Sequence, residues 1–141
     1  MLSQTAVYSL RAMTCLALQP PGEGTRAKDL SELTGVPTHY LSKILRRLVL
    51  AGLLDSRKGH GGGFSLARPA ESISFADILN ATDALPEQGQ CAFGWGACGT
   101  HEPCPLHDSW SRLLETFEGW STSTSLAQVA RSGVDPAKFV P

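Results

Sequence analysis

Apolar residues recur every three or four positions at the start of the chain, which is the spacing of a helix with one buried face. The pattern runs from about residue 3 to residue 19 and is ended by Pro20, Pro21 and Gly22. Cys15 lies within it, and we expect this lone thiol to be a small core residue. The predicted buried face comprises Val7, Leu10, Thr14 and Ala17.

A short second helix is expected over residues 27–34. Thr25 is a suitable cap for it, and Leu30 and Leu33 are predicted to face inward. Gly35 follows directly and suits the left-handed residue that ends many helices. The segment therefore predicts a helix that stops sharply before the next one.

A third helix is expected to begin at Pro37 and Thr38, since proline suits the first turn of a helix. Apolar residues from Leu41 to Leu48 follow at i, i+3, i+4 and i+7, so one face is predicted to be buried. Two short helices joined by a tight glycine turn are typical of a helix-turn-helix. The opposite face is polar and basic, with His39, Tyr40, Ser42, Lys43, Arg46 and Arg47.

A β-hairpin is predicted over residues 53–69, around a turn that contains four glycines. Leu54, Phe64 and Leu66 are expected to pack inward. A basic, glycine-rich hairpin directly after a helix-turn-helix is typical of a wing, whose tip reaches DNA phosphates or the minor groove. The tip is predicted to carry Arg57, Lys58 and His60.

The second half of the chain predicts two further helices on either side of a loop. Ser74 and Asp77 resemble a capping box that opens a helix to about Ala84. A loop follows over residues 86–105, and Pro105 opens a longer helix. The long helix has one aromatic-rich face, which we interpret as a dimer interface, with packing onto the chain's own winged helix as the alternative. That face comprises Leu106, Trp110, Leu113, Leu114, Phe117 and Trp120.

The length of 141 residues suits one domain, and 42% hydrophobic residues argue against wholesale disorder. No apolar run approaches the roughly 20 residues of a membrane span, and no signal peptide is visible. We therefore expect a cytoplasmic protein.

The formal net charge of −1 conceals an uneven distribution. Residues 26–68 carry eight basic and three acidic side chains, a net charge of +5, so the remainder is acidic. A localised basic segment is the footprint of a polyanion site. The candidate DNA-binding residues are Thr38, His39, Tyr40, Ser42, Lys43, Arg46, Arg47, Arg57, Lys58 and His60.

Three of the four cysteines fall within 14 residues, at Cys91, Cys98 and Cys104, and His107 follows. In a chain without an export signal, such a cluster indicates metal binding or redox chemistry. Three cysteines and one histidine match a structural zinc site, but gaps of six and five residues are wide for zinc. An iron–sulfur cluster tolerates wider spacing but takes four ligands. The spacing leaves both metals open, with unligated thiols as the third possibility.

These motifs, in this order, resemble the IscR/NsrR/CymR (Rrf2) family of bacterial winged-helix regulators. The resemblance covers about residues 1–130. It rests on the segments Tyr8–Met13, Thr38–Leu41, Ser56–Gly59 and Gly61–Phe64, together with the cysteine loop and the long helix.

The resemblance implies a homodimer joined through the long helix and bound to a palindromic operator in double-stranded DNA. It also implies an iron–sulfur cluster held by Cys91, Cys98 and Cys104, with His107 as the fourth ligand of a [2Fe-2S] cluster. Tyr40, Ser42 and Lys43 fall where relatives contact base edges, and Lys58 falls where a wing arginine often enters the minor groove.

Three positions depart from the family pattern. The first cysteine gap is six residues, where five is usual in IscR and NsrR. Tyr8 stands where NsrR-type members recruit a carboxylate from the partner subunit, which favours [2Fe-2S] over [4Fe-4S]. Ser42 replaces a glutamate that IscR uses to reject some bases, so we do not expect a switch between two classes of DNA site.

The sequence therefore predicts a mainly α-helical protein with a small β-hairpin. The expected parts are a winged helix-turn-helix domain (1–85), a cluster-binding loop (86–105), a dimerisation helix with a C-terminal helical segment (106–132) and a flexible tail (133–141). The expected function is an iron–sulfur-dependent repressor that senses redox state, nitric oxide or iron–sulfur status. The alternatives are a zinc-stabilised DNA-binding regulator and a small iron–sulfur electron carrier. His39, His60 and His101 are isolated, and no nucleophile–base arrangement indicates an enzyme.

Overall fold

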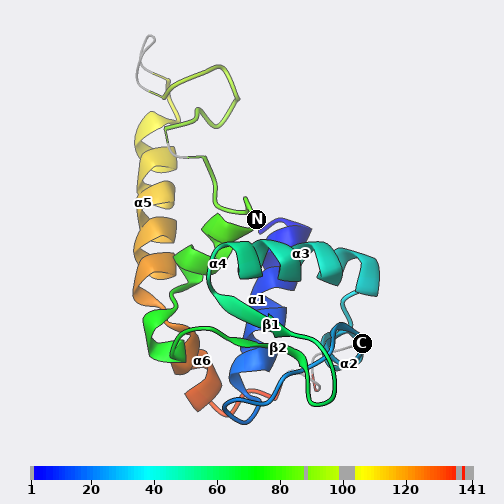
Figure 1. Cartoon of the computed structure of the whole chain (residues 1–141). Helices are drawn as coiled ribbons and strands as arrows, with labels where there is room; N and C mark the ends of the chain where they lie inside the picture. The colour runs from blue at the N-terminus through cyan, green and yellow to red at the C-terminus, as the bar shows by residue number, and fades with distance from the viewer. Residues whose placement is uncertain (1, 88, 99–103, 136–137, 139–141) are drawn as a thin grey trace.

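The computed structural model describes residues 2–87, 89–98, 104–135 and 138 of the chain. This part is mainly helical and contains one antiparallel hairpin, which confirms the expected fold class. Figure 1 shows a rounded body from which α5 and the loop before it project. The elements are α1 (Gln4–Ala17), α2 (Ala27–Thr34), α3 (Thr38–Leu50), β1 (Leu54–Arg57), β2 (Gly63–Leu66), the short 3₁₀ helix η1 (Ala70–Ser72), α4 (Phe75–Ala81), α5 (His107–Ser123) and α6 (Leu126–Arg131).

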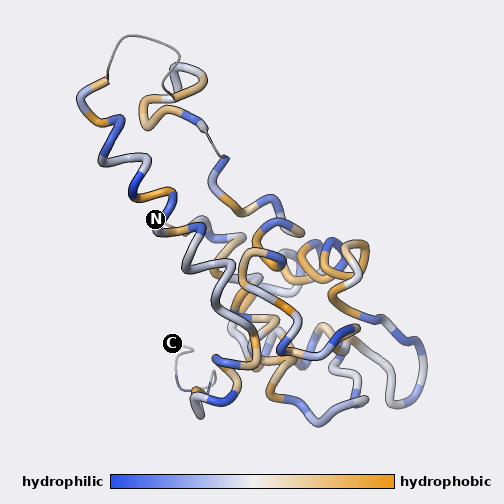
Figure 2. The backbone as a smooth tube through the Cα atoms, turned by 90° about the vertical axis from the view of Figure 1, so that its left-hand side faces the viewer, coloured by the Kyte–Doolittle hydropathy of each residue, from blue (hydrophilic) through white to orange (hydrophobic). Residues whose placement is uncertain are grey.

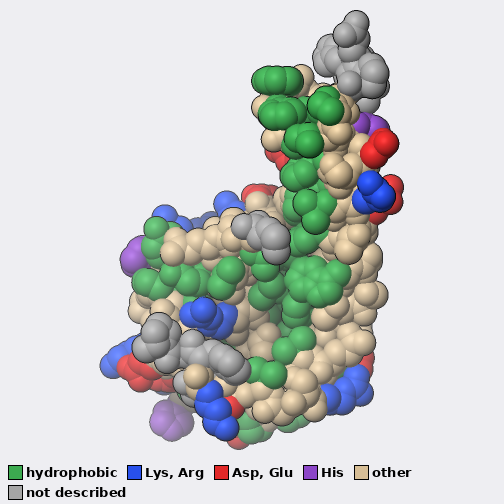
Figure 3. Space-filling view, turned by 180° about the vertical axis from the view of Figure 1, so that it is seen from behind, with side chains coloured by type: hydrophobic (Ala, Val, Ile, Leu, Met, Phe, Trp, Pro, Cys, Tyr) green, Lys and Arg blue, Asp and Glu red, His purple; other side chains and the backbone are tan. Residues whose placement is uncertain are grey.

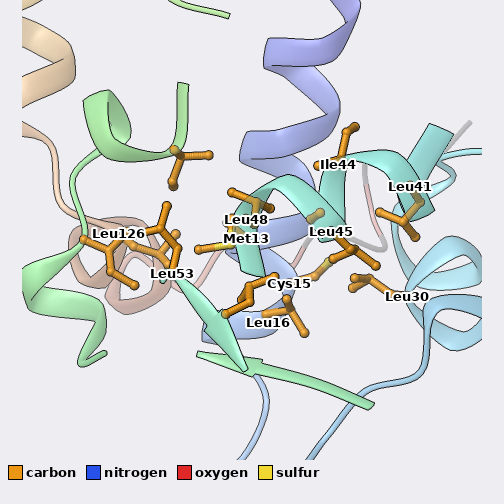
Figure 4. Close-up of a cluster of buried hydrophobic side chains, with 14 of the residues drawn as sticks. Met13, Cys15, Leu16, Leu30, Leu41, Ile44, Leu45, Leu48, Leu53 and Leu126 are labelled. Atoms are coloured by element: carbon orange, nitrogen blue, oxygen red, sulfur yellow. The ribbon is translucent and has the colours of Figure 1, made fainter. Parts of the chain in front are cut away.

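Helix α1 runs through the body and carries the centre of the core. The hydroxyl of Ser3 caps it by accepting a hydrogen bond of 3.1 Å from the backbone N–H of Ala6. Met13 and Cys15 are buried on this helix, as expected for Cys15. Figure 4 shows Met13 next to Leu48 of α3 within one cluster of buried side chains. The predicted first helix is confirmed, and it ends two residues earlier than expected. Of its predicted buried face only Thr14 is buried, while Val7, Leu10 and Ala17 are half-buried.

Helices α2 and α3 form the predicted pair, joined through Gly35 in the left-handed conformation at φ 69°. The apolar face of α3 from Leu41 to Leu48 is buried, as the spacing predicts. The prediction that Leu33 faces inward is wrong, because its side chain is 38% exposed on the outer side of α2. The predicted cap at Thr25 is also wrong. Arg26 occupies the cap position without a side-chain hydrogen bond, while the backbone of Thr25 pairs with the hairpin.

Strands β1 and β2 pair with Leu54 opposite Leu66 and Arg57 opposite Gly63. Leu54 is buried, and Phe64 and Leu66 are half-buried against the core. This register confirms the predicted inward set. It leaves residues 58–62 as a glycine-rich tip beyond the sheet.

Helix α4 begins with the predicted capping box, in which Ser74 and Asp77 each accept a hydrogen bond from the other's backbone N–H. It ends at Ala81, three residues earlier than expected. Helix α6 lies within the same core, where Leu126 is fully buried and its N–H donates to the carbonyl of Ile73 at 2.8 Å. The C-terminal helical segment thus packs onto the winged helix itself. The expected flexible tail lies largely outside the described residues.

Helix α5 begins at His107, two residues after Pro105, and Ser121 is its only buried residue. Figure 2 shows it rising away from the body, with its last turns against the other helices. Within the described residues, no helix has the length and apolar character needed to cross a membrane.

Candidate functional site

The polar face of α3 is exposed along its whole length. Tyr40 is 44% exposed, and its ring contacts those of His39, at a centroid distance of 4.4 Å, and Tyr8, at 6.0 Å. Lys43 and Arg46 are exposed further along the same helix. Figure 1 shows α2, the start of α3 and the tip of the hairpin on its right-hand side, opposite α5. The start of α3 and the tip of the wing therefore lie on the side away from the cysteine loop.

Arg47 differs from its neighbours because it binds its own chain. Its guanidinium lies 3.1 Å from a carboxylate oxygen of Asp83 and donates to the carbonyl of Thr82 at 3.0 Å. These contacts join α3 to the end of α4. The predicted phosphate contact of Arg47 stays a prediction, and in this conformation the side chain serves as a link between helices.

The root of the wing is joined to the segment before α2. Thr25 and Phe64 exchange both backbone hydrogen bonds, at 2.9 and 2.8 Å. A Cβ atom on Gly63 would lie only 2.5 Å from the carbonyl carbon of Thr25, and Gly63 has φ 129°. Glycine is therefore required for the two backbones to approach this closely. The wing is thus fixed at its root, where its backbone is paired with the segment before α2.

We expect Gly63→Ala to lower the free energy of unfolding by about 1–3 kcal/mol more than Gly61→Ala. Both residues have positive φ, but a Cβ on Gly61 meets nothing within 4 Å. The difference therefore combines the clash at the wing root with the greater backbone strain of alanine at φ 129° than at φ 72°. Urea unfolding of the two variants measures the difference. Equal stabilities would show that the backbone pairing of Thr25 with Phe64 can open without a loss of stability.

The cysteine loop is folded by its own backbone around Cys91 and Cys98. The N–H of Cys91 donates to the carbonyl of Gly96 at 3.1 Å, and the N–H of Cys98 donates to the carbonyl of Gly89 at 2.6 Å. The thiol sulfur of Cys91 accepts a hydrogen bond of 3.4 Å from the N–H of Phe93. These bonds hold the two cysteines at the two ends of one small turn structure.

His107 meets the loop at the first residue of α5. Its Nδ1 lies 3.1 Å from the Sγ of Cys98, within hydrogen-bonding distance. Its backbone N–H donates to the carbonyl of Cys104 at 3.0 Å. A soft thiolate and an imidazole are both good ligands for zinc or an iron–sulfur cluster. Two of the four predicted ligands are therefore adjacent.

The full predicted ligand set is not assembled in this structure. Among the described residues, no three His, Cys, Asp or Glu side chains lie close enough to hold one metal ion. His101, a weaker candidate ligand, lies outside the described residues. The donor chemistry fits an iron–sulfur cluster or zinc, and binding either would require Cys91 and Cys104 to join the pair formed by Cys98 and His107.

Trp110 anchors the loop to α5. Its indole N–H donates to the carbonyl of Gln90 at 2.8 Å. Cys98, His107 and Trp110 also line a pocket of about 320 Å³ that continues along α5 toward α4. The loop is therefore attached to the first turns of α5.

The apolar strip predicted on α5 is largely open to solvent. Leu106 is 42% exposed and Leu113 is 52% exposed. Figure 3 shows hydrophobic side chains following one another along the projecting helix down to the body. Trp120, at its lower end, packs edge-on against Phe75 of the same chain with the ring centroids 5.5 Å apart. A groove of about 590 Å³ runs along the strip and is lined by Leu2, Pro86, Trp110, Leu113, Leu114, Thr116, Phe117 and Trp120.

Comparison with known proteins decides the family. Residues 2–132 match the family model of Rrf2, described as an iron-dependent transcriptional regulator. The chain belongs to the Rrf2 family. The match spans the winged helix, the cysteine loop and both helices after it, so the family assignment covers every described element.

The curated relatives of this Rrf2 chain include transcription regulators of the helix-turn-helix type. It is 29% identical to IscR of Klebsiella pneumoniae over 131 residues, which cover 93% of this chain and 80% of the relative. It is 28% identical to IscR of Escherichia coli with the same coverage. This Rrf2 protein is accordingly a DNA-binding transcription regulator and not an enzyme.

Solved structures show the same fold. CymR of B. subtilis, described as the global cysteine regulator, gives a TM-score of 0.78 at 24% identity, covering 95% of this chain and 98% of that one. IscR of T. potens gives 0.76 at 22% identity, covering 95% and 88%. CymR of Staphylococcus aureus in its oxidised form gives 0.74 at 26% identity, covering 92% and 95%. The architecture of this Rrf2 chain is thus that of known winged-helix regulators.

Two features of the Rrf2 site were missed by the sequence reasoning. The contact between Arg47 and Asp83 joins residues 36 positions apart, which no local pattern reports. The backbone pairing of Thr25 with Phe64 joins residues 39 positions apart and was likewise not predicted. The run of glycines at the wing root was a signal that two backbones approach each other there.

Proposed function

We propose that this Rrf2 protein is an iron–sulfur-cluster-dependent repressor that binds a palindromic operator as a homodimer. The observation that carries the proposal is the pair formed by Cys98 and His107 at the first residue of α5, with Sγ and Nδ1 3.1 Å apart. This pair places a thiol and an imidazole at the N-terminal end of α5, the helix whose apolar strip is exposed. Since a repressor acts on the chromosome, we place the protein in the cytoplasm.

Cys91, Cys98, Cys104 and His107 would hold the cluster, which we assign as [2Fe-2S]. Tyr8 offers no carboxylate for a [4Fe-4S] site, and His107 is already in contact with Cys98. A bound cluster supplies a redox-active centre that reacts with oxygen or nitric oxide and reports iron supply. The loop glycines let the backbone curl and donate hydrogen bonds toward the sulfurs.

The described contacts form a continuous route from the loop to the DNA-binding helix. Trp110 joins the loop to α5, and Trp120 at the other end of α5 packs on Phe75 of α4. Asp83, just after α4, pairs with Arg47 of α3. In a dimer, a small tilt of α5 would thereby move the two recognition helices, which must match half-sites about 34–36 Å apart.

The exposed residues of α3 and of the wing would contact either the DNA phosphates or the bases. Lys43, Arg46 and Arg57 supply phosphate contacts, which give affinity that falls with salt. Tyr40 and Ser42 face the bases in the major groove, and Lys58 at the wing tip reaches the minor groove. Thr38, His39 and His60 flank these contacts.

The test is a visible absorption spectrum, with iron, sulfide and zinc analysis, of protein purified without oxygen. A brown protein with iron and acid-labile sulfide in equal amounts would support the proposal. A colourless protein with one zinc per chain would instead assign the loop a structural role. A brown protein that binds no DNA duplex would favour the electron carrier.

A further inference from the structure

We propose that a cleft at the root of the wing binds one phosphate of the DNA backbone, held jointly by Arg26 and Arg57. The cleft has a volume of about 310 Å³. It is lined by Arg26, Ala27, Ser56, Arg57, Gly59, Gly62, Gly63 and Phe64. This assignment rests on DNA binding by the winged helix and adds Arg26 to its contact surface.

The two arginines come from different parts of the chain, and a backbone pairing brings these parts together. Arg26 precedes α2, and Arg57 ends β1. The backbone pairing of Thr25 with Phe64 brings these segments together. Both arginines therefore line the same small cleft, and two like charges there favour a bound anion.

Both guanidinium groups are available. Each arginine is exposed, and within the described residues neither forms a salt bridge, whereas Arg47 and Arg68 do. Aspartate and glutamate are absent from the residues that line the cleft. The nearest acidic residues in sequence are Glu23, Asp29 and Asp55, and none of them lines this cleft. Glu23 and Asp55 line the neighbouring cleft, which Arg57 also borders. The cleft is therefore a positively charged site without an internal counterion.

The floor of the cleft suits close approach by a phosphate. Gly59, Gly62 and Gly63 contribute no side chains, and the hydroxyl of Ser56 can donate a hydrogen bond beside the arginines. Guanidinium groups bind phosphate oxygens through paired N–H donors. The cleft thus offers the donor set of a phosphate site.

The position of the cleft points to DNA and not to a free anion. It lies between α2 and the hairpin, on the side of the molecule that carries the start of α3 (Figure 1). Both side chains are exposed, so a free ion would be held only weakly against solvent. A duplex docked on α3 and the wing would instead present its phosphates at fixed positions.

The experiment measures binding of the full-length protein to a fluorescent duplex of random sequence over a series of salt concentrations. A contact that neutralises one phosphate contributes about 0.9 to the slope of log K against log[salt]. We expect Arg26→Ala/Arg57→Ala to lower that slope by about 0.9, the value for one shared phosphate. Arg131→Ala removes one positive charge from α6, at a residue that does not line the cleft, and should leave the slope unchanged.

Each other outcome overturns a part of the proposal. A slope lower by about 1.8 would show two separate phosphates, and a slope equal to that of Arg131→Ala would show that the cleft does not face DNA. Arg26→Ala alone should weaken duplex binding several-fold at low salt, because Arg57 then holds the phosphate without its partner. Binding equal to that of the wild type would show that Arg57 acts without Arg26. If the wild-type protein binds no duplex, the proposed function itself fails.

A second experiment distinguishes binding of a DNA phosphate from binding of free phosphate. Relative to potassium chloride of the same ionic strength, potassium phosphate should raise the melting temperatures of the wild type and of Arg26→Ala/Arg57→Ala by the same amount, since phosphate stabilises folded proteins through exclusion from their surface. A rise in phosphate that disappears in Arg26→Ala/Arg57→Ala would show a site for a free anion and overturn the assignment to DNA. Equal melting temperatures of the variants and the wild type in chloride would show that folding is intact.

Discussion

Leu113→Glu is expected to convert the protein from a dimer to a monomer. Leu113 is 52% exposed in the single chain and lines the groove along α5, so a second copy would bury it. A glutamate there would place two unpaired carboxylates in a symmetric interface, which costs a large desolvation penalty. At a loss of about 2 kcal/mol, typical of an interface hot spot, the dissociation constant rises about thirtyfold.

Sedimentation velocity over a range of concentrations measures this effect. Ser109→Glu is the matched control, because it adds the same charge to α5 at an exposed residue outside the groove. The control should remain dimeric. If Leu113→Glu and Ser109→Glu sediment alike, the strip on α5 is not the dimer interface and another partner must cover it.

Cys98→Ser is expected to abolish iron binding, while Cys15→Ala retains about two iron atoms per chain. Cys98 is one of the two adjacent ligands, and replacing its thiolate by a hydroxyl removes a soft donor. Cys15 is buried in the core, and desolvation raises the pKa of its thiol to about 11, so it stays protonated at neutral pH. Iron and sulfide analysis after anaerobic purification measures the difference.

The role of His107 has a more specific signature. If it is a ligand, His107→Cys should retain a cluster with a lower reduction potential, because histidine ligation raises the potential relative to thiolate. A purely structural histidine would leave the potential of His107→Cys unchanged. Retention of iron by Cys98→Ser, or loss from Cys15→Ala alone, would contradict the ligand assignment.

The elements that the sequence predicted best are those whose signals are local. The spacing from Leu41 to Leu48 gave the buried face of α3, and Gly35 marked the left-handed end of α2. The capping box at Ser74 gave the start of α4. In each case the residues that carry the signal are within one or two helical turns of one another.

The predictions that failed depended on contacts between distant segments. Thr25 has the chemistry of a helix cap, but its backbone is paired with Phe64 in the hairpin, which moves the cap position to Arg26. Leu33 fits the apolar period of α2, yet the helix is short and the body covers only its Leu30 side. Propensity is a weak guide where tertiary contacts compete with it.

In the candidate site, too, local features could be predicted from the sequence and contacts between distant residues could not. The exposed face of α3 and the wing followed from periodicity and charge. For Cys98 and His107, the sequence predicted only that both bind the same metal centre. The spacing alone did not decide between zinc and an iron–sulfur cluster. The route from the loop to Arg47 could not be predicted from the sequence, because each tertiary contact along it joins residues at least 20 positions apart.

The most direct test of the account compares DNA affinity with and without the cluster. A duplex selected from a random library by the anaerobic protein serves as the operator, and binding is measured at one fixed salt concentration. We expect the dissociation constants of the cluster-loaded and cluster-free proteins to differ by roughly 5- to 150-fold, the usual range of allosteric coupling. Equal dissociation constants for the two forms would contradict the claim that the loop controls the DNA-binding helices.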